Sequence, residues 1–214
     1  MKSNLLPIAR EGWYFLYVSA ALFLFFAFLD FDNLEFMAFL ATAFFVYVFR
    51  NPERESVAYE QESVVSPVDG VVVSIEELSQ MNEYKVEIDS TYFNVSLLRA
   101  PFTASLQRIN INHGARLQLN SPLAKDINEN AEIVFSNKSG YTIRIIHMLK
   151  QSFKSIEIDA YEGKNVLQGV RYGFMLNGIT TIYVPRNFRL NIDVGNELRA
   201  SETLIGYFTA EKKS

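Results

Sequence analysis

The chain has 214 residues, a formal net charge of −4 at pH 7, no cysteine and two histidines. The absence of cysteine excludes disulfides, zinc sites built on thiolates and a thiol nucleophile. The negative net charge disfavours a nucleic-acid partner, and the scarcity of histidine leaves few candidates for a general base near neutral pH.

Two strongly apolar runs dominate the N-terminal region, at residues 13–29 and 34–49, and Glu35, at the start of the second run, is their one charged residue. Each is slightly shorter than the roughly 20 residues of a spanning helix, so the pair predicts a helical hairpin that crosses a thin bilayer or dips into it. Charged residues flank and separate the runs. Lys2, Arg10, Arg50 and Arg54 lie outside them, and Asp30, Asp32 and Glu35 lie at the turn, with Glu35 at the start of the second run. Basic flanks predict an inner-membrane location with both ends of the hairpin, and the domain that follows it, in the cytoplasm.

The chain is therefore predicted to have two parts, a membrane hairpin at 1–50 and one domain at 51–214 that begins with a polar linker at 51–62. β-branched or alternating segments with turn residues between them predict that this domain is all-β. The expected strands lie at 71–73, 85–88, 93–98, 143–146 and 155–159. Asp69-Gly70 and Asn177-Gly178 are typical of tight turns. A weak helical pattern at 120–130 is the only one expected in this domain.

The C-terminal segment at 192–206 has short strand-like pieces separated by Val194-Gly195 and by Gly206. It resembles the closing hammerhead of lipoyl- and biotinyl-type β-sandwiches. The domain is therefore predicted to be a β-sandwich of that kind, and this resemblance of fold implies no function by itself.

Several motifs occur in the order and spacing of one known family, across nearly the whole chain. They are Ala9-Arg10-Glu11-Gly12-Trp13, Phe49-Arg50-Asn51-Pro52-Glu53-Arg54, Ser66-Pro67-Val68-Asp69-Gly70, Asn128-Glu129-Asn130 and Gly169-Val170-Arg171-Tyr172-Gly173. On these motifs the sequence resembles the short, membrane-anchored phosphatidylserine decarboxylases. The resemblance implies a place in phosphatidylethanolamine synthesis and membrane phospholipid as a partner.

The resemblance also implies a self-processing reaction. In that family a Gly-Ser bond cleaves itself, the serine becomes an N-terminal pyruvoyl group, and an aspartate–histidine pair activates the serine hydroxyl. Asp69 matches the family's aspartate, but Ser96 stands where the family has its histidine. Ile179 follows Gly178 where the serine is expected, and no Gly-Ser or Gly-Thr dipeptide occurs in the chain. The precursor of the pyruvoyl cofactor is thus missing, and no other cofactor is expected.

Other residues offer alternatives to this degenerate processing site. Cleavage before Thr180 or Thr181 would leave a ketobutyryl group and would have to occur after a β-branched residue, which resists the unusual backbone geometry that glycine permits. His113 is interpreted as a solvated turn histidine and His147 as a core histidine. Two histidines so far apart predict no metal site.

The residues therefore indicate first a membrane-associated family member without self-processing, which binds lipid or regulates an active decarboxylase. One alternative is an active decarboxylase with an atypical processing site near Thr180, and another is a membrane-anchored structural adaptor. The expected protein partner is an active decarboxylase or a second copy of the chain.

Overall fold

The computed structural model describes residues 6–54, 62–118 and 121–209. The chain divides into two compact units, Met1–Glu53 and Arg54–Ser214, which we call the hairpin unit and the β unit. Lys2, most of the expected linker at 51–62 and Asn120 lie outside the described residues.

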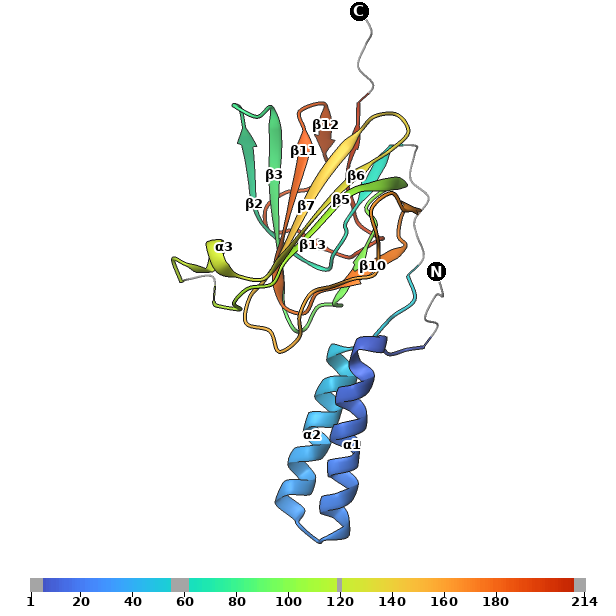
Figure 1. Ribbon diagram of the computed structural model, residues 1–214, viewed down its shortest axis with the longest axis vertical. Coiled ribbons are helices and arrows are strands. Elements are labelled where there is room, and N and C mark those ends of the chain that lie inside the picture. Colours follow the sequence, from blue (N-terminus) through green and yellow to red (C-terminus); the bar gives the residue numbers. More distant parts are fainter. Residues whose placement is uncertain (1–5, 55–61, 119–120, 210–214) are drawn as a thin grey trace, which may run out of the picture. The chain divides into compact units, whose positions relative to one another are not determined.

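The hairpin unit consists of a 3₁₀ turn and two helices that run side by side (Figure 1). The elements are the turn Arg10–Gly12, α1 (Trp13–Phe28) and α2 (Asp32–Val48). Gly12 allows the start of α1 to approach the end of α2, because a Cβ atom at this position would lie 2.4 Å from the Cβ of Phe49. Phe15 stacks on Phe49 with ring centroids 5.4 Å apart, and the amide of Ala9 donates to the carbonyl of Phe49 at 2.8 Å. The base of the hairpin is therefore tightly packed.

Most apolar side chains of the hairpin unit are exposed, as at Phe28, which is 85% exposed. The buried residues of the two helices are few: Leu16 and Ser19 in α1, and Ala38 and Val48 in α2. Among the described residues one helical stretch, Arg10–Phe28, is long and apolar enough to cross a membrane. The expected N-terminal helix with the character of a membrane anchor is thus confirmed, and its orientation stays a prediction.

The β unit contains one sheet of eight strands and two sheets of three strands. The large sheet has the order β13-β2-β3-β11-β7-β6-β5-β9, with bounds β2 (Gly70–Leu78), β3 (Glu83–Ser90), β5 (Ala104–Asn112), β6 (Asn130–Ser136), β7 (Thr142–Leu149), β9 (Asn165–Val166), β11 (Gly178–Pro185) and β13 (Glu197–Leu198). The small sheets are β1 (Ser63–Val65), β14 (Leu204–Phe208) and β12 (Phe188–Leu190), and β4 (Leu97–Arg99), β10 (Arg171–Phe174) and β8 (Glu157–Ile158). The single helix described in this unit is α3 (Ala124–Ile127).

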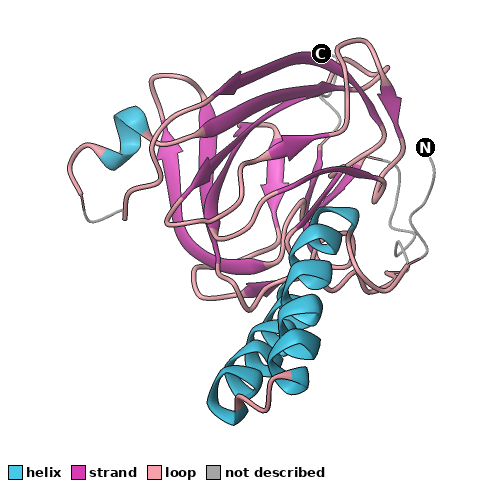
Figure 2. Cartoon of the chain, turned by 60° about the horizontal axis from the view of Figure 1, so that its bottom comes forward, coloured by secondary structure: helices cyan, strands magenta, loops and turns pink. Residues whose placement is uncertain are grey.

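The core of the β unit lies on one face of the large sheet. The strands of this unit curve around a common interior (Figure 2). Strands β3, β6, β7 and β11 bury every second side chain, as the period of a half-buried strand requires. The same apolar cluster includes Leu98, Tyr172 and Ile205 from the two small sheets. The small sheets therefore cover the buried face, and the predicted mainly-β class is confirmed.

Several local predictions were wrong. The strand expected at 93–98 is reduced to β4, because Thr91 and Asn94 form a side-chain turn in which Asn94 Oδ1 accepts the amide of Thr91 at 2.8 Å. The strand expected at 155–159 is reduced to β8, and the weak helical pattern at 120–130 to the single turn α3. Gly70 begins β2, where it pairs with Leu198 of β13, instead of completing a tight turn. Glycine is needed there because a Cβ atom would lie 2.4 Å from the carbonyl oxygen of Asp89.

Candidate active site

The structure brings the three predicted site segments together at one end of the large sheet. Ser90, the last residue of β3, pairs with Gly178 in register and donates its hydroxyl to the backbone carbonyl of Asp69 at 2.6 Å. The amide of Met175 donates to the carbonyl of Ser96 at 2.9 Å. Asp69, Ser96 and Gly178 therefore share one region, although they are far apart along the chain.

The carboxylate of Asp69 is buried and fully engaged by structural partners. It receives two hydrogen bonds from Arg54, with Nη1 at 2.7 Å from Oδ1 and Nη2 at 2.6 Å from Oδ2. The amide of Ala200 donates to Oδ1 at 2.8 Å. The side chains of Arg54 and Asp69 are only 7% and 9% exposed. The sequence analysis placed Arg54 in the flank of the hairpin, and no pattern in the sequence pointed to its pairing with Asp69.

Gly178, Ile179 and Thr180 are the first three residues of β11, which pairs with a strand on each side. In register, they face Ser90, Asp89 and Ile88 of β3 and Leu149, Met148 and His147 of β7. A Cβ atom at Gly178 would lie 2.6 Å from both the carbonyl oxygen of Met148 and the sulfur of Met175, so the packing requires glycine. The peptide bonds on both sides of Ile179 therefore belong to a regular, doubly paired strand.

A chain of three buried polar side chains crosses the core at Thr180. His147 Nδ1 lies 2.8 Å from Thr180 Oγ1, and His147 Nε2 lies 2.6 Å from the hydroxyl oxygen of Tyr172. All three residues are fully buried. Thr180 lies on β11, His147 on β7 and Tyr172 on β10. A hydroxyl beside an imidazole that a third group orients is also the arrangement of an activated nucleophile. The sequence analysis did not anticipate an imidazole beside Thr180.

The pKa values decide what this chain of side chains can do. Burial lowers the pKa of His147 from 6.5 to about 3, and burial raises the pKa of the Tyr172 hydroxyl above its ordinary value. The neutral imidazole therefore donates through one nitrogen and accepts through the other. A base with so low a pKa is poorly matched to proton abstraction at neutral pH. The geometry suits His147 to join β10 to β7 and β11 better than to activate Thr180.

The depressed pKa of His147 predicts a pH dependence of stability. The unfolded chain binds a proton at this residue below pH 6.5, whereas the folded β unit does so only near pH 3, so stability is lost as the pH falls through this window. Between pH 7 and pH 5 the loss should be about 2 kcal/mol. Urea unfolding of the full chain in detergent, compared with His147→Gln, measures it. The same pH slope in both proteins would contradict the assignment, and His113→Gln, at an exposed histidine, is the control.

The Asn-Glu motif holds the loop before β6 to the end of β7. Asn128 Nδ2 donates to the carbonyl of Leu149 at 2.8 Å. Glu129, 2% exposed in its side chain, accepts the amide of Ile156 at 2.9 Å and lies 3.0 Å from a guanidinium nitrogen of Arg116. These contacts are structural. Among the described residues no group of three or more His, Cys, Asp or Glu side chains could hold a metal ion.

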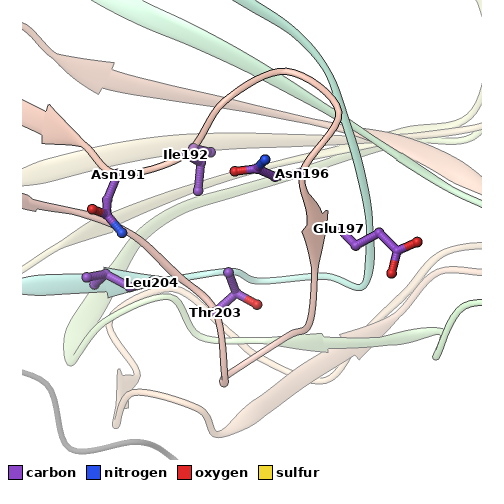
Figure 3. Close-up of a pocket in the computed structure, with 6 residues that line it drawn as sticks. All are labelled: Asn191, Ile192, Asn196, Glu197, Thr203 and Leu204. Carbon is purple, nitrogen blue, oxygen red and sulfur yellow. The ribbon is translucent and has the colours of Figure 1, made fainter.

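A surface hollow of about 490 Å³ lies between the β12–β13 loop and the turn before β14 (Figure 3). None of the predicted site residues lines it. Its lining residues are Asn191, Ile192, Asn196, Glu197, Thr203 and Leu204. The Thr203 hydroxyl oxygen accepts the amide of Arg199 at 2.9 Å, so this hydroxyl serves the turn. The lining includes no histidine or lysine that could act as a base.

Comparison with known proteins agrees with the resemblance seen in the motifs. The model of the phosphatidylserine decarboxylase family matches residues 41–206. A phosphatidylserine decarboxylase proenzyme of Desulfotalea psychrophila is 31% identical over 206 residues, which cover 94% of this chain and 96% of that protein. Proenzymes of the same description from Burkholderia mallei and Paraburkholderia phymatum are each 27% identical over 203 residues, covering 92% of this chain and 94% and 95% of theirs. The chain therefore belongs to the phosphatidylserine decarboxylase family.

Proposed function

We propose that this family member acts in phospholipid metabolism by binding phospholipid at a membrane without performing the self-processing reaction. The observation that carries the proposal is Ile179, which follows Gly178 and has no hydroxyl. The proposed location is the inner membrane with the β unit in the cytoplasm, supported by the basic flanks and the acidic turn of the hairpin. An active decarboxylase or a second copy of this chain is the proposed protein partner.

The residues present do not fit a pyruvoyl group, which must be made from a serine after the scissile bond. Ile179 offers no oxygen nucleophile. Ser96, where the family has its histidine, has no group that titrates near neutral pH. Asp69 retains its carboxylate, but Arg54 and the amide of Ala200 occupy it. These features support a scaffold that is kept for binding.

One observation favours the alternative of an active decarboxylase with an atypical processing site. Thr180 Oγ1 lies within hydrogen-bond distance of the His147 imidazole. Two features oppose it. The pKa of His147 is about 3, and Thr180 lies inside a strand that is paired on both sides. We therefore rank binding without processing first.

A decarboxylation assay with a lipid-retention measurement tests the proposal. The full chain in mixed micelles of detergent and phosphatidylserine should release no carbon dioxide above a protein-free control, because the chain carries no precursor serine. It should retain phospholipid through gel filtration. A family member with an intact Gly-Ser bond serves as the positive control. Release that disappears in Thr180→Ala would favour the atypical decarboxylase, and a chain that retains no lipid but co-purifies with a membrane protein would favour the adaptor.

A further inference from the structure

One end of the β unit carries a group of exposed apolar side chains. We call it the loop end: residues 91–96, 121–129 and 150–156, where β3 and β7 finish and β11 begins. In Figure 1, α3 lies at this end and the β2–β3 turn at the opposite end of the large sheet. The exposed large apolar residues of the loop end are Phe93, Leu123, Ile127 and Phe153. Phe93 is 71% exposed and is not one of the buried residues of the core.

The aromatic residues of the loop end are held in place by local hydrogen bonds. Asn94 Oδ1 accepts both the amide and the hydroxyl of Thr91, at 2.8 and 2.9 Å, in the turn that presents Phe93. Tyr92 stacks on Phe153 with ring centroids 5.9 Å apart, and its hydroxyl donates to the carbonyl of Gln151 at 2.8 Å. Because these groups are already ordered, they would lose little conformational freedom on contact with a partner.

Two lysines beside this apolar group form ion pairs, whereas Lys125 and Asp126 are exposed between Leu123 and Ile127. Lys150 forms an ion pair with Asp89, and Lys154 forms one with Glu157. Paired charges are less unfavourable than isolated ones in an environment of low dielectric constant. The loop end is thus compatible with the boundary between water and hydrocarbon.

The chain connects the hairpin unit to the β unit at this same end. Arg54 is the first residue of the β unit, and its ion pair with Asp69 fixes it near Ser90, whose hydroxyl binds the Asp69 carbonyl. From Phe49, after the end of α2, to Arg54 the chain advances five residues, which span at most about 18 Å when fully extended. The membrane attachment of the hairpin therefore keeps the loop end close to the bilayer.

We propose that the loop end docks on the phospholipid bilayer and inserts Phe93 and Leu123 into the membrane–water interface. Aromatic and aliphatic side chains on an ordered surface favour this zone. The occupant is lipid because the chain enters the β unit at this end directly from an apolar hairpin. The inference rests on the membrane attachment proposed above, and it holds whether or not the chain processes itself.

Single-cysteine labelling tests the docking, because the chain has no cysteine of its own. Nitroxide labels are placed at Phe93→Cys and Leu123→Cys in the full chain, in vesicles of phosphatidylethanolamine and phosphatidylglycerol. Matched controls are Met81→Cys and Val194→Cys, which are exposed apolar positions in other loops. Leu24→Cys in α1 reports whether the hairpin itself enters the bilayer. The collision rates with oxygen and with a water-soluble nickel chelate measure the depth of each label.

Labels at 93 and 123 should collide with the nickel chelate several-fold less than labels at 81 and 194, and more with oxygen. If labels at 93 and 123 are as accessible to the chelate as the controls while the label at 24 is deep, the docking is refuted and the attachment stands. A label at 24 that is fully accessible refutes the attachment and the docking with it. Spin–spin broadening at 93 that disappears on dilution with unlabelled chain would show a second copy on this surface and would also overturn the proposal.

Discussion

A preparation of the full chain should give one intact mass near 24.5 kDa and no second polypeptide. The residue directly after Gly178 is Ile179, which has no hydroxyl. The hydroxyls of Thr180 and Thr181 belong to strand β11, which is paired on both sides. Attack by Thr180 on the carbonyl of Ile179 would require that peptide group to leave the ladder, with loss of roughly 0.5–1.5 kcal/mol for each hydrogen bond broken. The neighbouring imidazole of His147, with a pKa of about 3, is too weak a base to compensate.

Intact-mass spectrometry of matched variants distinguishes an unprocessed chain from a decarboxylase that cleaves itself before Thr180. Thr180→Ala and His147→Gln should match the unaltered chain except for the mass of the substitution. Ile179→Ser creates a Gly-Ser bond and should also stay intact, since Ser96 cannot act as the base. A C-terminal fragment that begins at Thr180 with a keto-bearing, blocked terminus, and that vanishes in Thr180→Ala, would instead establish the atypical decarboxylase.

Arg54→Met should lower the free energy of unfolding of the β unit by about 3–5 kcal/mol, because it leaves the buried carboxylate of Asp69 without its cation. The carboxylate would keep the hydrogen bond from the amide of Ala200, which does not neutralise its charge. Urea unfolding of the full chain in detergent, followed by the strand signal in circular dichroism, measures the effect. The double variant Arg54→Met with Asp69→Asn should recover part of the loss, because the buried charge is then gone.

The matched control for this ion pair is Arg186 with Glu77, in the same unit. Their charged atoms lie 3.2 Å apart, but the side chains are 58% and 45% exposed. Water screens such a pair, so Arg186→Met should change the free energy of unfolding by less than about 1 kcal/mol. If Arg54→Met were no more destabilising than Arg186→Met, the view that the family's aspartate serves a structural role in this chain would be wrong.

The sequence by itself determined the features that depend on composition and short-range periodicity. An apolar run nearly long enough to cross a bilayer favours a helix such as α1, because a helix satisfies its backbone hydrogen bonds within the segment. The alternation at 85–88 and 143–146 predicted strands that the structure contains as parts of β3 and β7. The absence of a serine after Gly178 is a covalent fact, which no fold can alter. The family resemblance rests on such local motifs and needed no coordinates.

Only the tertiary structure decided which polar groups meet. Arg54 and Asp69 are 15 positions apart, and Asp69 and Ala200 are 131 apart, so no local periodicity could pair them. The imidazole of His147 reaches Thr180 because the register of β7 against β11 makes them cross-strand neighbours. A shift of that register by one residue would turn the side chain to the other face of the sheet. Strand register and long-range packing, which arise from the whole core at once, therefore determined the surroundings of the retained aspartate and of the Thr180 hydroxyl beside the His147 imidazole.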